Sequence, residues 1–240
     1  MPYASTRREG AVEIIGHRGS PRERRENTLP SFTRAFALGS DGVELDVHGT
    51  SDGIVVIHHD PVTNARSGDT GPQAPIAETT LASLPAIGGS GERIPTLESL
   101  LAGVPEHAIV YIEVKAREIE EHVVAVIRAS RTRCAVHSFD HRVARRVHVI
   151  APDIPVGILQ TSYPIDPIRP MRDAGARDLW QHWELIDQPL IDAVHDDGRR
   201  IIAWTVNDAD VARRLISWQV DGLCTDVPGV MRPLRDELVG

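Results

Sequence analysis

The sequence has few of the features that mark membrane proteins and disulfide scaffolds. Only 4% of the 240 residues are aromatic. The longest apolar runs, such as Ile54–Ile57 and Ala108–Ile112, fall far short of the roughly 20 residues that a helix needs to cross a bilayer. We therefore expect no stable membrane insertion and, since no secretory signal follows the first residues, a cytoplasmic location. The only two cysteines, Cys134 and Cys224, lie inside apolar runs, which indicates reduced core thiols.

Positive charge is scarce. Lysine and arginine number 26 against 34 aspartates and glutamates, so the formal net charge is -8. A chain of this charge repels polyanions, and we expect no nucleic-acid partner. The excess of acid favours the binding of cations instead. Lys115 is the only lysine, so one compact ammonium is kept where the other strongly basic side chains are all planar guanidinium groups.

Short β-rich runs alternate with helical segments along the chain. The runs that indicate strands are Val12–Gly16, Gly42–Val47, Ile54–His58, Ala108–Val114, Cys134–His137, Val156–Leu159, Arg177–Trp180, Ile201–Val206 and Gly222–Thr225. The clearest helices are Thr28–Leu38, Glu118–Ala129, Asp140–Ile150, Pro189–Asp197 and Asp208–Trp218. Eight strands remain when Ile54–His58 is set aside. Eight strands alternating with helices predict a closed (β/α)8 TIM barrel in a single domain, residues 1–240, with a doubly wound open sheet as the alternative.

Residue types that commonly begin or end helices flank these segments. Asn27, Asp140 and Asp208 stand at or near helix starts and are predicted caps, because their side chains can accept hydrogen bonds from the first backbone N–H groups. Gly39 and Gly198 follow two helix ends, where glycine readily adopts the left-handed conformation that stops a helix.

The run Ile54–His58 predicts a β-hairpin extension after the second strand, since only Ser51-Asp52-Gly53 precedes it. A two-residue Asp52-Gly53 turn would pair His59 with Asp46. A shift of one residue would still return His59 to the neighbourhood of Glu44 and Asp46. The following segment, residues 61–95, is rich in Gly, Pro and Thr and is expected to form a short insertion before the third strand and a partly mobile lid.

Two strands each carry a pair of charged residues two positions apart. Glu44 and Asp46 share one face of the second strand, and Glu113 and Lys115 share one face of the next barrel strand. An inward face would bury like charges, which is costly without a counter-ion. Such oxygen ligands suit Mg²⁺ or Ca²⁺. For either pair alone, ordinary surface ion pairs are the alternative interpretation.

The first strand ends in a histidine and an arginine between two glycines, Gly16 and Gly19. Glycine lets the backbone turn sharply, so His17 and Arg18 can project at the barrel mouth. Histidine titrates near neutrality, and arginine offers a fork of donors that matches phosphate oxygens.

These motifs, in order, resemble the glycerophosphodiester phosphodiesterase family. The matching residues are His17-Arg18-Gly19, Glu26-Asn27-Thr28, Glu44-x-Asp46, Thr50-x-Asp52-Gly53, His59-Asp60, Pro95-Thr96-Leu97, Glu113-x-Lys115, Trp204-Thr205-Val206-Asn207 and Thr225-Asp226-x-Pro228. The match covers about residue 14 to residue 228. The resemblance implies a TIM-type barrel that binds one divalent cation.

The same resemblance assigns roles to individual residues. It implies that Glu44, Asp46 and Glu113 are metal ligands, that His17 and His59 are the catalytic acid and base, and that Arg18 and Lys115 hold the phosphate. We favour His17 as the base and His59 as the acid, with water or the glycerol 2-hydroxyl as the nucleophile. This division fits the chemistry, because a phosphodiester must be neutralised, attacked, and relieved of its alkoxide by proton transfer.

The leading functional hypothesis is hydrolysis of glycerophosphodiesters, such as glycerophosphocholine and glycerophosphoethanolamine, to sn-glycerol 3-phosphate and an alcohol. A lysophospholipase D-like enzyme and a non-catalytic binding barrel are the alternatives. The scarcity of aromatic residues counts against the first alternative, and the presence of both histidines and every predicted ligand counts against the second. We expect a small-molecule substrate and a monomer or homodimer.

Other polar residues admit two interpretations. Trp204 packs against the glycerol moiety, which we favour, or plugs the barrel mouth. Asp226 caps a helix or supports an active-site group. His48 lies near the barrel mouth or, as we favour, on the surface of the hairpin. His58 is expected to face away from His59 and to be structural. The loop Arg22–Arg25, where the resembling family often has a proline, either attracts a second anion or, as we favour, is a solvated charged loop.

Overall fold

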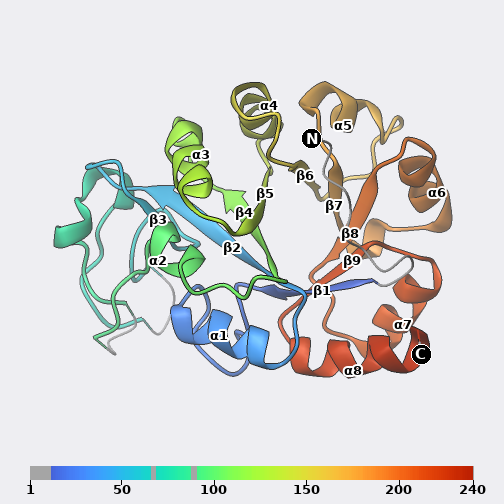
Figure 1. The fold of residues 1–240 in the computed structure, drawn as a ribbon, viewed down its shortest axis with the longest axis horizontal. Helices are drawn as coiled ribbons and strands as arrows, with labels where there is room; N and C mark the ends of the chain where they lie inside the picture. Colours follow the sequence, from blue (N-terminus) through green and yellow to red (C-terminus); the bar gives the residue numbers. More distant parts are fainter. Residues whose placement is uncertain (1–11, 66–68, 88–90, 240) are drawn as a thin grey trace.

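Eight parallel strands close into a barrel in the computed structural model, which describes residues 12–65, 69–87 and 91–239 (Figure 1). They are β1 (Glu13–His17), β2 (Gly42–Gly49), β4 (Ile109–Val114), β5 (Arg133–Ser138), β6 (Val156–Gln160), β7 (Asp178–His182), β8 (Arg200–Trp204) and β9 (Gly222–Thr225). Each strand pairs in parallel with its neighbours, and the pairing of β1 with β2 completes the ring. The predicted TIM barrel is confirmed, and the open sheet is excluded.

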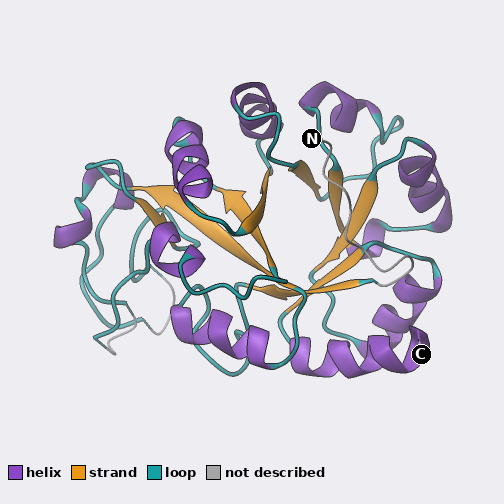
Figure 2. Cartoon of the chain, viewed as in Figure 1, coloured by secondary structure: helices purple, strands orange, loops and turns teal. Residues whose placement is uncertain are grey.

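Helices surround the barrel on its outer side (Figure 2). They are α1 (Leu29–Ala37), α2 (Leu97–Leu101), α3 (Glu120–Ala129), α4 (His141–Ile150), α5 (Arg169–Ala174), α6 (Gln188–Asp196), α7 (Ala209–Ser217) and α8 (Pro228–Val239). Among the described residues, single turns of 3₁₀ helix occur at Ile76–Glu78, Leu81–Ser83 and Trp183–Leu185. Within the described ranges, no helix has both the length and the apolar character needed to cross a membrane.

The helix ends follow the predicted chemistry with one correction. Asp140 and Asp208 cap α4 and α7 by accepting backbone N–H groups, and Gly39 and Gly198 have positive φ angles of 84° and 70° after α1 and α6. Asn27 was expected to cap α1, but Thr28 does so, because its side chain accepts from the N–H of Ser31. Asn27 instead turns its amide toward β2.

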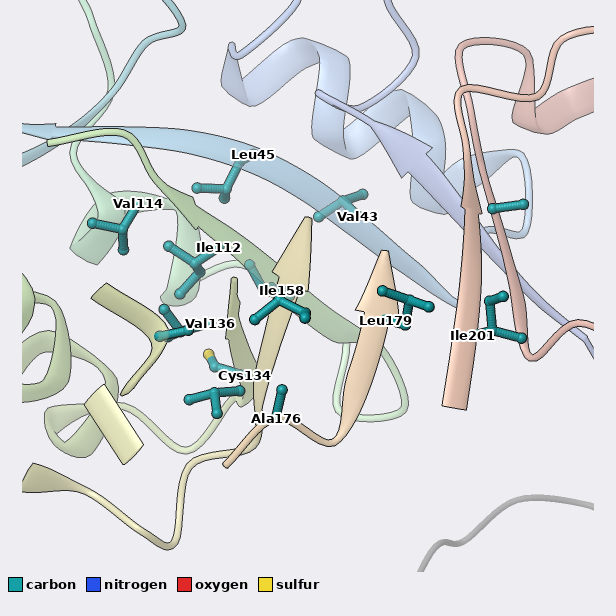
Figure 3. Packing of buried hydrophobic residues seen from close by; sticks show 14 of the residues in the cluster. Val43, Leu45, Ile112, Val114, Cys134, Val136, Ile158, Ala176, Leu179 and Ile201 are labelled. Carbon is teal, nitrogen blue, oxygen red and sulfur yellow. The ribbon is translucent and has the colours of Figure 1, made fainter. Parts of the chain in front are cut away.

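Alternate residues of each strand separate two apolar layers. The outward layer lies between the barrel and the helices, and Figure 3 shows its members Val43, Leu45, Ile112, Val114, Cys134, Val136, Ile158, Ala176, Leu179 and Ile201. A second cluster fills the barrel interior; it contains Ile15, Tyr111, Trp180 and Ile202. Cys134 belongs to the outward layer and Cys224 to the interior, and both are buried free thiols, as predicted.

Charged residues close the end of the barrel where the strands begin. Arg177 makes two hydrogen bonds to Asp178, at 2.9 and 2.6 Å, and Arg200 lies 2.8 Å from Glu13. Tyr111 Oη donates to Glu13 at 2.5 Å. These contacts lie at the end of the barrel opposite to the one at which βα loops carry function in barrels of this kind.

The predicted hairpin forms, with a register one residue from the expected one. Strand β3 (Val55–Ile57) runs antiparallel to β2 and pairs Ile57 with Val47. The turn holds three residues rather than two, because Thr50 N–H donates to the carbonyl of Ile54 and Gly53 takes a φ of 79°. His58, not His59, therefore lies beside Asp46, and its N–H donates to the Asp46 carbonyl at 3.0 Å.

The insertion after β3 packs on the hairpin. Its described residues contribute Ile76, Leu84, Ile87 and Ile94 to a small apolar cluster around Val56 of β3. In Figure 1 the segment lies beside β3 and α2, away from the centre of the barrel. The lid role of residues 61–95 and the single-domain organisation stay predictions.

The packing predicts different costs for two equivalent truncations. Val43→Ala removes methyl groups from a fully buried position between barrel and helices, so we expect the free energy of unfolding to fall by about 2–3 kcal/mol. Val149→Ala, at a position of α4 that is 61% exposed, should change it by less than about 0.5 kcal/mol. Urea unfolding followed by circular dichroism measures both, and equal effects would contradict the assigned outward layer.

Candidate active site

Strand register brings charged residues together at the open end of the barrel. His17 pairs with Glu44 between β1 and β2, and Asp46 pairs with Glu113 between β2 and β4. Glu113 in turn pairs with His137 of β5. Because the carboxyl ends of parallel strands meet at one mouth, these side chains occupy one region. Sequence reasoning did not single out His137.

A pocket of about 130 Å³ opens at this mouth. Seven of the predicted site residues line it: His17, Arg18, Glu44, His59, Glu113, Lys115 and Trp204. The eighth, Asp46, is fully buried directly beside them. A larger hollow of about 840 Å³ lies between α2 and α3, but none of these residues lines it. The described residues of segment 61–95 do not line the small pocket either.

Asp46 is held by cationic and amide groups. Its Oδ2 atom lies 3.0 Å from Arg18 Nε and accepts a hydrogen bond from Asn27 Nδ2 at 2.8 Å. Its Oδ1 atom lies 3.5 Å from Lys115 Nζ. Burial opposes ionisation of this carboxyl, but Arg18 and Lys115 outweigh burial and lower the pKa of Asp46. Asp46 is therefore a stable anion without any added ion.

Glu44 and Glu113 are less well compensated. Burial, followed by the charge of Asp46, raises the pKa of Glu44 well above its ordinary value. The same two causes raise the pKa of Glu113 to about 7, although Lys115 Nζ lies 2.9 Å from it. Buried carboxyls that resist ionisation indicate a missing positive charge, which a divalent cation would supply.

The arrangement of donor atoms fits such a cation. One ligand atom from each of Glu44, Glu113 and His137 lies within 4.8 Å of the other two. Burial lowers the pKa of His137 to about 3, so its imidazole is neutral, which is the form that binds metals. The assignment of Asp46 as a third carboxylate ligand stays a prediction.

His17 is oriented by a carboxylate. Its Nδ1 atom donates to Asp226 Oδ1 at 2.7 Å, and Asn207 Nδ2 donates to the other Asp226 oxygen at 2.7 Å. The Nε2 atom is left on the side of Glu44, at 4.0 Å. These contacts favour the interpretation that Asp226 supports an active-site group. Asp208, not Asp226, caps helix α7.

His59 has an equivalent partner. Its Nδ1 atom donates to Asp60 Oδ1 at 2.7 Å. Burial first, and then Arg18 and Lys115, lower the pKa of His59, although Asp46 acts in the opposite direction. His48 was expected on the hairpin surface, but it is buried, and its Nε2 donates to the carbonyl of His59 at 3.0 Å. The hairpin register produces this contact, because β2 turns His48 inward under the returning chain.

Aromatic rings form one side of the mouth. Trp204 packs edge-to-face against Phe139 and His182, with ring centroids 5.4 and 5.5 Å apart. Lys115 Nζ lies 5.9 Å above the ring of Phe139. Phe139 was not predicted, because it follows its strand in sequence and carries no charge that would draw notice.

The arginine loop after β1 has mixed contacts. Arg22 is largely exposed and lies 3.7 Å from Asp226, whereas Arg25 pairs with Asp69 of the insertion at 2.8 Å. Arg24 donates to the backbone of Glu23. Both interpretations of the loop stay predictions.

Comparisons with known proteins find relatives that match most of the chain. The sequence model of the "Glycerophosphoryl diester phosphodiesterase family" matches residues 17–230. A glycerophosphodiester phosphodiesterase of Caldanaerobacter subterraneus subsp. tengcongensis is 31% identical over 232 residues, which cover 90% of this chain and 94% of that protein.

Solved structures of phosphodiesterases have a similar fold. A phosphodiesterase of Oleispira antarctica, crystallised with its product sn-glycerol-3-phosphate, superposes with a TM-score of 0.86 at 25% identity, covering 94% of this chain and 97% of that one. A glycerophosphodiester phosphodiesterase of Thermotoga maritima superposes with a TM-score of 0.80 at 26% identity, covering 93% and 98%.

The buried acids are expected to lower the stability of the free chain and to allow it to bind a cation. Glu44→Gln should raise the thermal unfolding midpoint in EDTA at pH 8, by an amount equivalent to about 0.5–2 kcal/mol, because the folded chain no longer buries this acid. The same change should remove the rise in midpoint that a divalent cation gives the parent chain. Glu237→Gln, at an exposed position of α8, serves as the matched control and should change neither value. A lower midpoint for Glu44→Gln in EDTA would show that the acid is already compensated.

Proposed function

The chain belongs to the glycerophosphoryl diester phosphodiesterase family and is a phosphodiesterase of glycerophosphodiesters, and from this premise we propose that it uses one divalent cation and two histidines to release sn-glycerol 3-phosphate. Glycerophosphocholine and glycerophosphoethanolamine are the proposed substrates. The observation that carries the mechanism is the pair of imidazoles, each fixed at Nδ1 by a carboxylate and each lining the same pocket.

The cationic residues bind the phosphate in this proposal. Glu44, Asp46 and Glu113 would hold a cation, for which their oxygen atoms favour Mg²⁺ or Ca²⁺. When bound, the cation supplies positive charge that stabilises the phosphoryl oxygens during the reaction. Arg18 and Lys115 add donors from the protein itself, because both line the pocket and both are partly exposed toward it.

The two histidines move protons. Because each Nδ1 atom donates to a carboxylate, each neutral ring presents the lone pair of Nε2. We assign His17 as the base that activates the nucleophile and His59 as the acid that protonates the leaving alcohol. The lowered pKa of His59 opposes its protonation in the free protein. An anionic phosphate beside the ring favours the protonated form, so substrate binding prepares the acid.

The size and walls of the pocket support a small substrate. A volume of about 130 Å³ accommodates a phosphate and a glycerol unit, whereas sites for drug-sized ligands usually enclose at least about 300 Å³. In the proposal, Trp204 packs on the glycerol carbons, with Phe139 supporting its ring.

The first measurement is release of glycerol 3-phosphate from glycerophosphocholine and glycerophosphoethanolamine by the purified chain. We expect release with Mg²⁺ or Ca²⁺, none in EDTA, and a loss of about 10²–10⁴-fold in kcat for His17→Ala. Val149→Ala, far from the pocket on an exposed face of α4, serves as the control that should keep full activity. If no metal supports release, the proposed substrate is wrong and lysophospholipids are the next to assay.

The acid role of His59 has its own test. His59→Ala should lose about 10²–10⁴-fold in rate on an ester of a simple alcohol, yet retain most of the rate on a nitrophenyl ester, because a good leaving group needs no proton. His17→Ala should lose activity on both. Equal losses on the two esters for His59→Ala would exclude the acid role, and the reverse pattern would exchange the two histidines.

A further inference from the structure

His137 is a buried polar side chain without a partner. It is 1% exposed, and neither of its ring nitrogens makes a hydrogen bond within the described part of the chain. A neutral imidazole has one N–H to donate and one lone pair that accepts, and leaving buried polar atoms without a hydrogen bond is unfavourable. Its Nε2 atom instead lies 3.9 Å from Glu44 Oε1, too far for a hydrogen bond.

The ring is fixed in place by its neighbours. Strand pairing sets His137 beside Glu113, and the imidazole stacks on Trp180 with a centroid distance of 4.2 Å and an interplanar angle of 13°. Gly157 on the next strand makes room for the indole, since a Cβ there would approach Trp180 Cδ1 to 3.0 Å. An imidazole held this rigidly is positioned before any ligand arrives.

The surrounding atoms match a coordination sphere. Donor atoms of Glu44, Glu113 and His137 lie within 4.8 Å of one another. Two ligands on one ion are separated by at most about twice the bond length, or about 4–5 Å for bonds of 2.0–2.4 Å. One ion among these three donor atoms would bond both to the unpaired imidazole nitrogen and to the two buried carboxyl groups.

We propose that His137 is a direct ligand of the divalent ion, so that an imidazole joins the carboxylates of Glu44 and Glu113 at the centre. The inference rests on the proposed function in one respect, that an ion binds at this mouth, and it changes which ion is preferred. An imidazole nitrogen suits borderline first-row ions such as Mn²⁺ and Zn²⁺ better than Ca²⁺, which takes oxygen ligands.

Electron spin-echo spectroscopy of the chain loaded with Mn²⁺ tests the bond directly, because it detects a nitrogen nucleus coordinated to the ion. We expect nitrogen coupling in the parent chain and its loss in His137→Gln. His17 is the other imidazole near Glu44, so His17→Asn is the matched control and should retain the coupling. Coupling that survives in His137→Gln, or that is absent from the parent chain, would overturn the proposal.

Calorimetric titration supplies a second readout that requires no turnover. In His137→Gln the Kd for Zn²⁺ should rise at least about 10-fold, while the Kd for Ca²⁺ should change by less than about 3-fold. Equal weakening for both ions would mean that His137 only supports the fold, and thermal unfolding in EDTA checks that the variant folds. If the parent chain binds no divalent ion at all, the metal part of the proposed function fails as well. If an ion binds but no nitrogen coupling is seen, only the role of His137 as a ligand is excluded.

Discussion

The burial of carboxyl groups inside the barrel is the constraint on which the site depends. Positions that a TIM barrel usually fills with apolar side chains hold Glu44, Asp46 and Glu113 here. Burying like charges is unfavourable unless opposite charges are close by. Arg18 and Lys115 meet this need for Asp46 alone. The two glutamates keep an electrostatic deficit, and the fold retains it because outward-facing apolar residues of the same strands supply the stability.

The buried carboxyl groups could be predicted from the sequence. Period-two spacing placed Glu44 with Asp46 and Glu113 with Lys115 on shared faces, and the alternation of strands and helices predicted the barrel that turns those faces inward. Flanking glycines pointed to His17, the predicted hairpin returned His59 toward the acids, and the ordered motifs gave both histidines a catalytic role. Five helices showed clear periodicity. Those that were missed are α2 and α5, which have five and six residues, and α8, which contains Pro233.

What the sequence could not supply is register between distant segments. Alternation alone cannot distinguish a two-residue from a three-residue turn, so the hairpin was predicted one residue out of register. His137 shows the same limit. It is the penultimate residue of β5 and faces inward, as Glu113 is and does in β4, but a single histidine in an apolar run carries little signal. Only the pairing of β4 with β5 sets it beside two acids.

Lys115 connects the ion to the phosphate. Its ammonium lies 2.9 Å from Glu113 and 3.5 Å from Asp46, so in the free chain these two carboxylates largely compensate its positive charge. A cation bound by the glutamates would neutralise their negative charge, so that the ammonium could interact with a phosphate instead. Ion and substrate should therefore strengthen each other's binding, and linkage requires the effect to be equal in both directions. An arginine would serve this position poorly, because its planar fork would stay committed to a carboxylate whereas an ammonium can turn toward either anion.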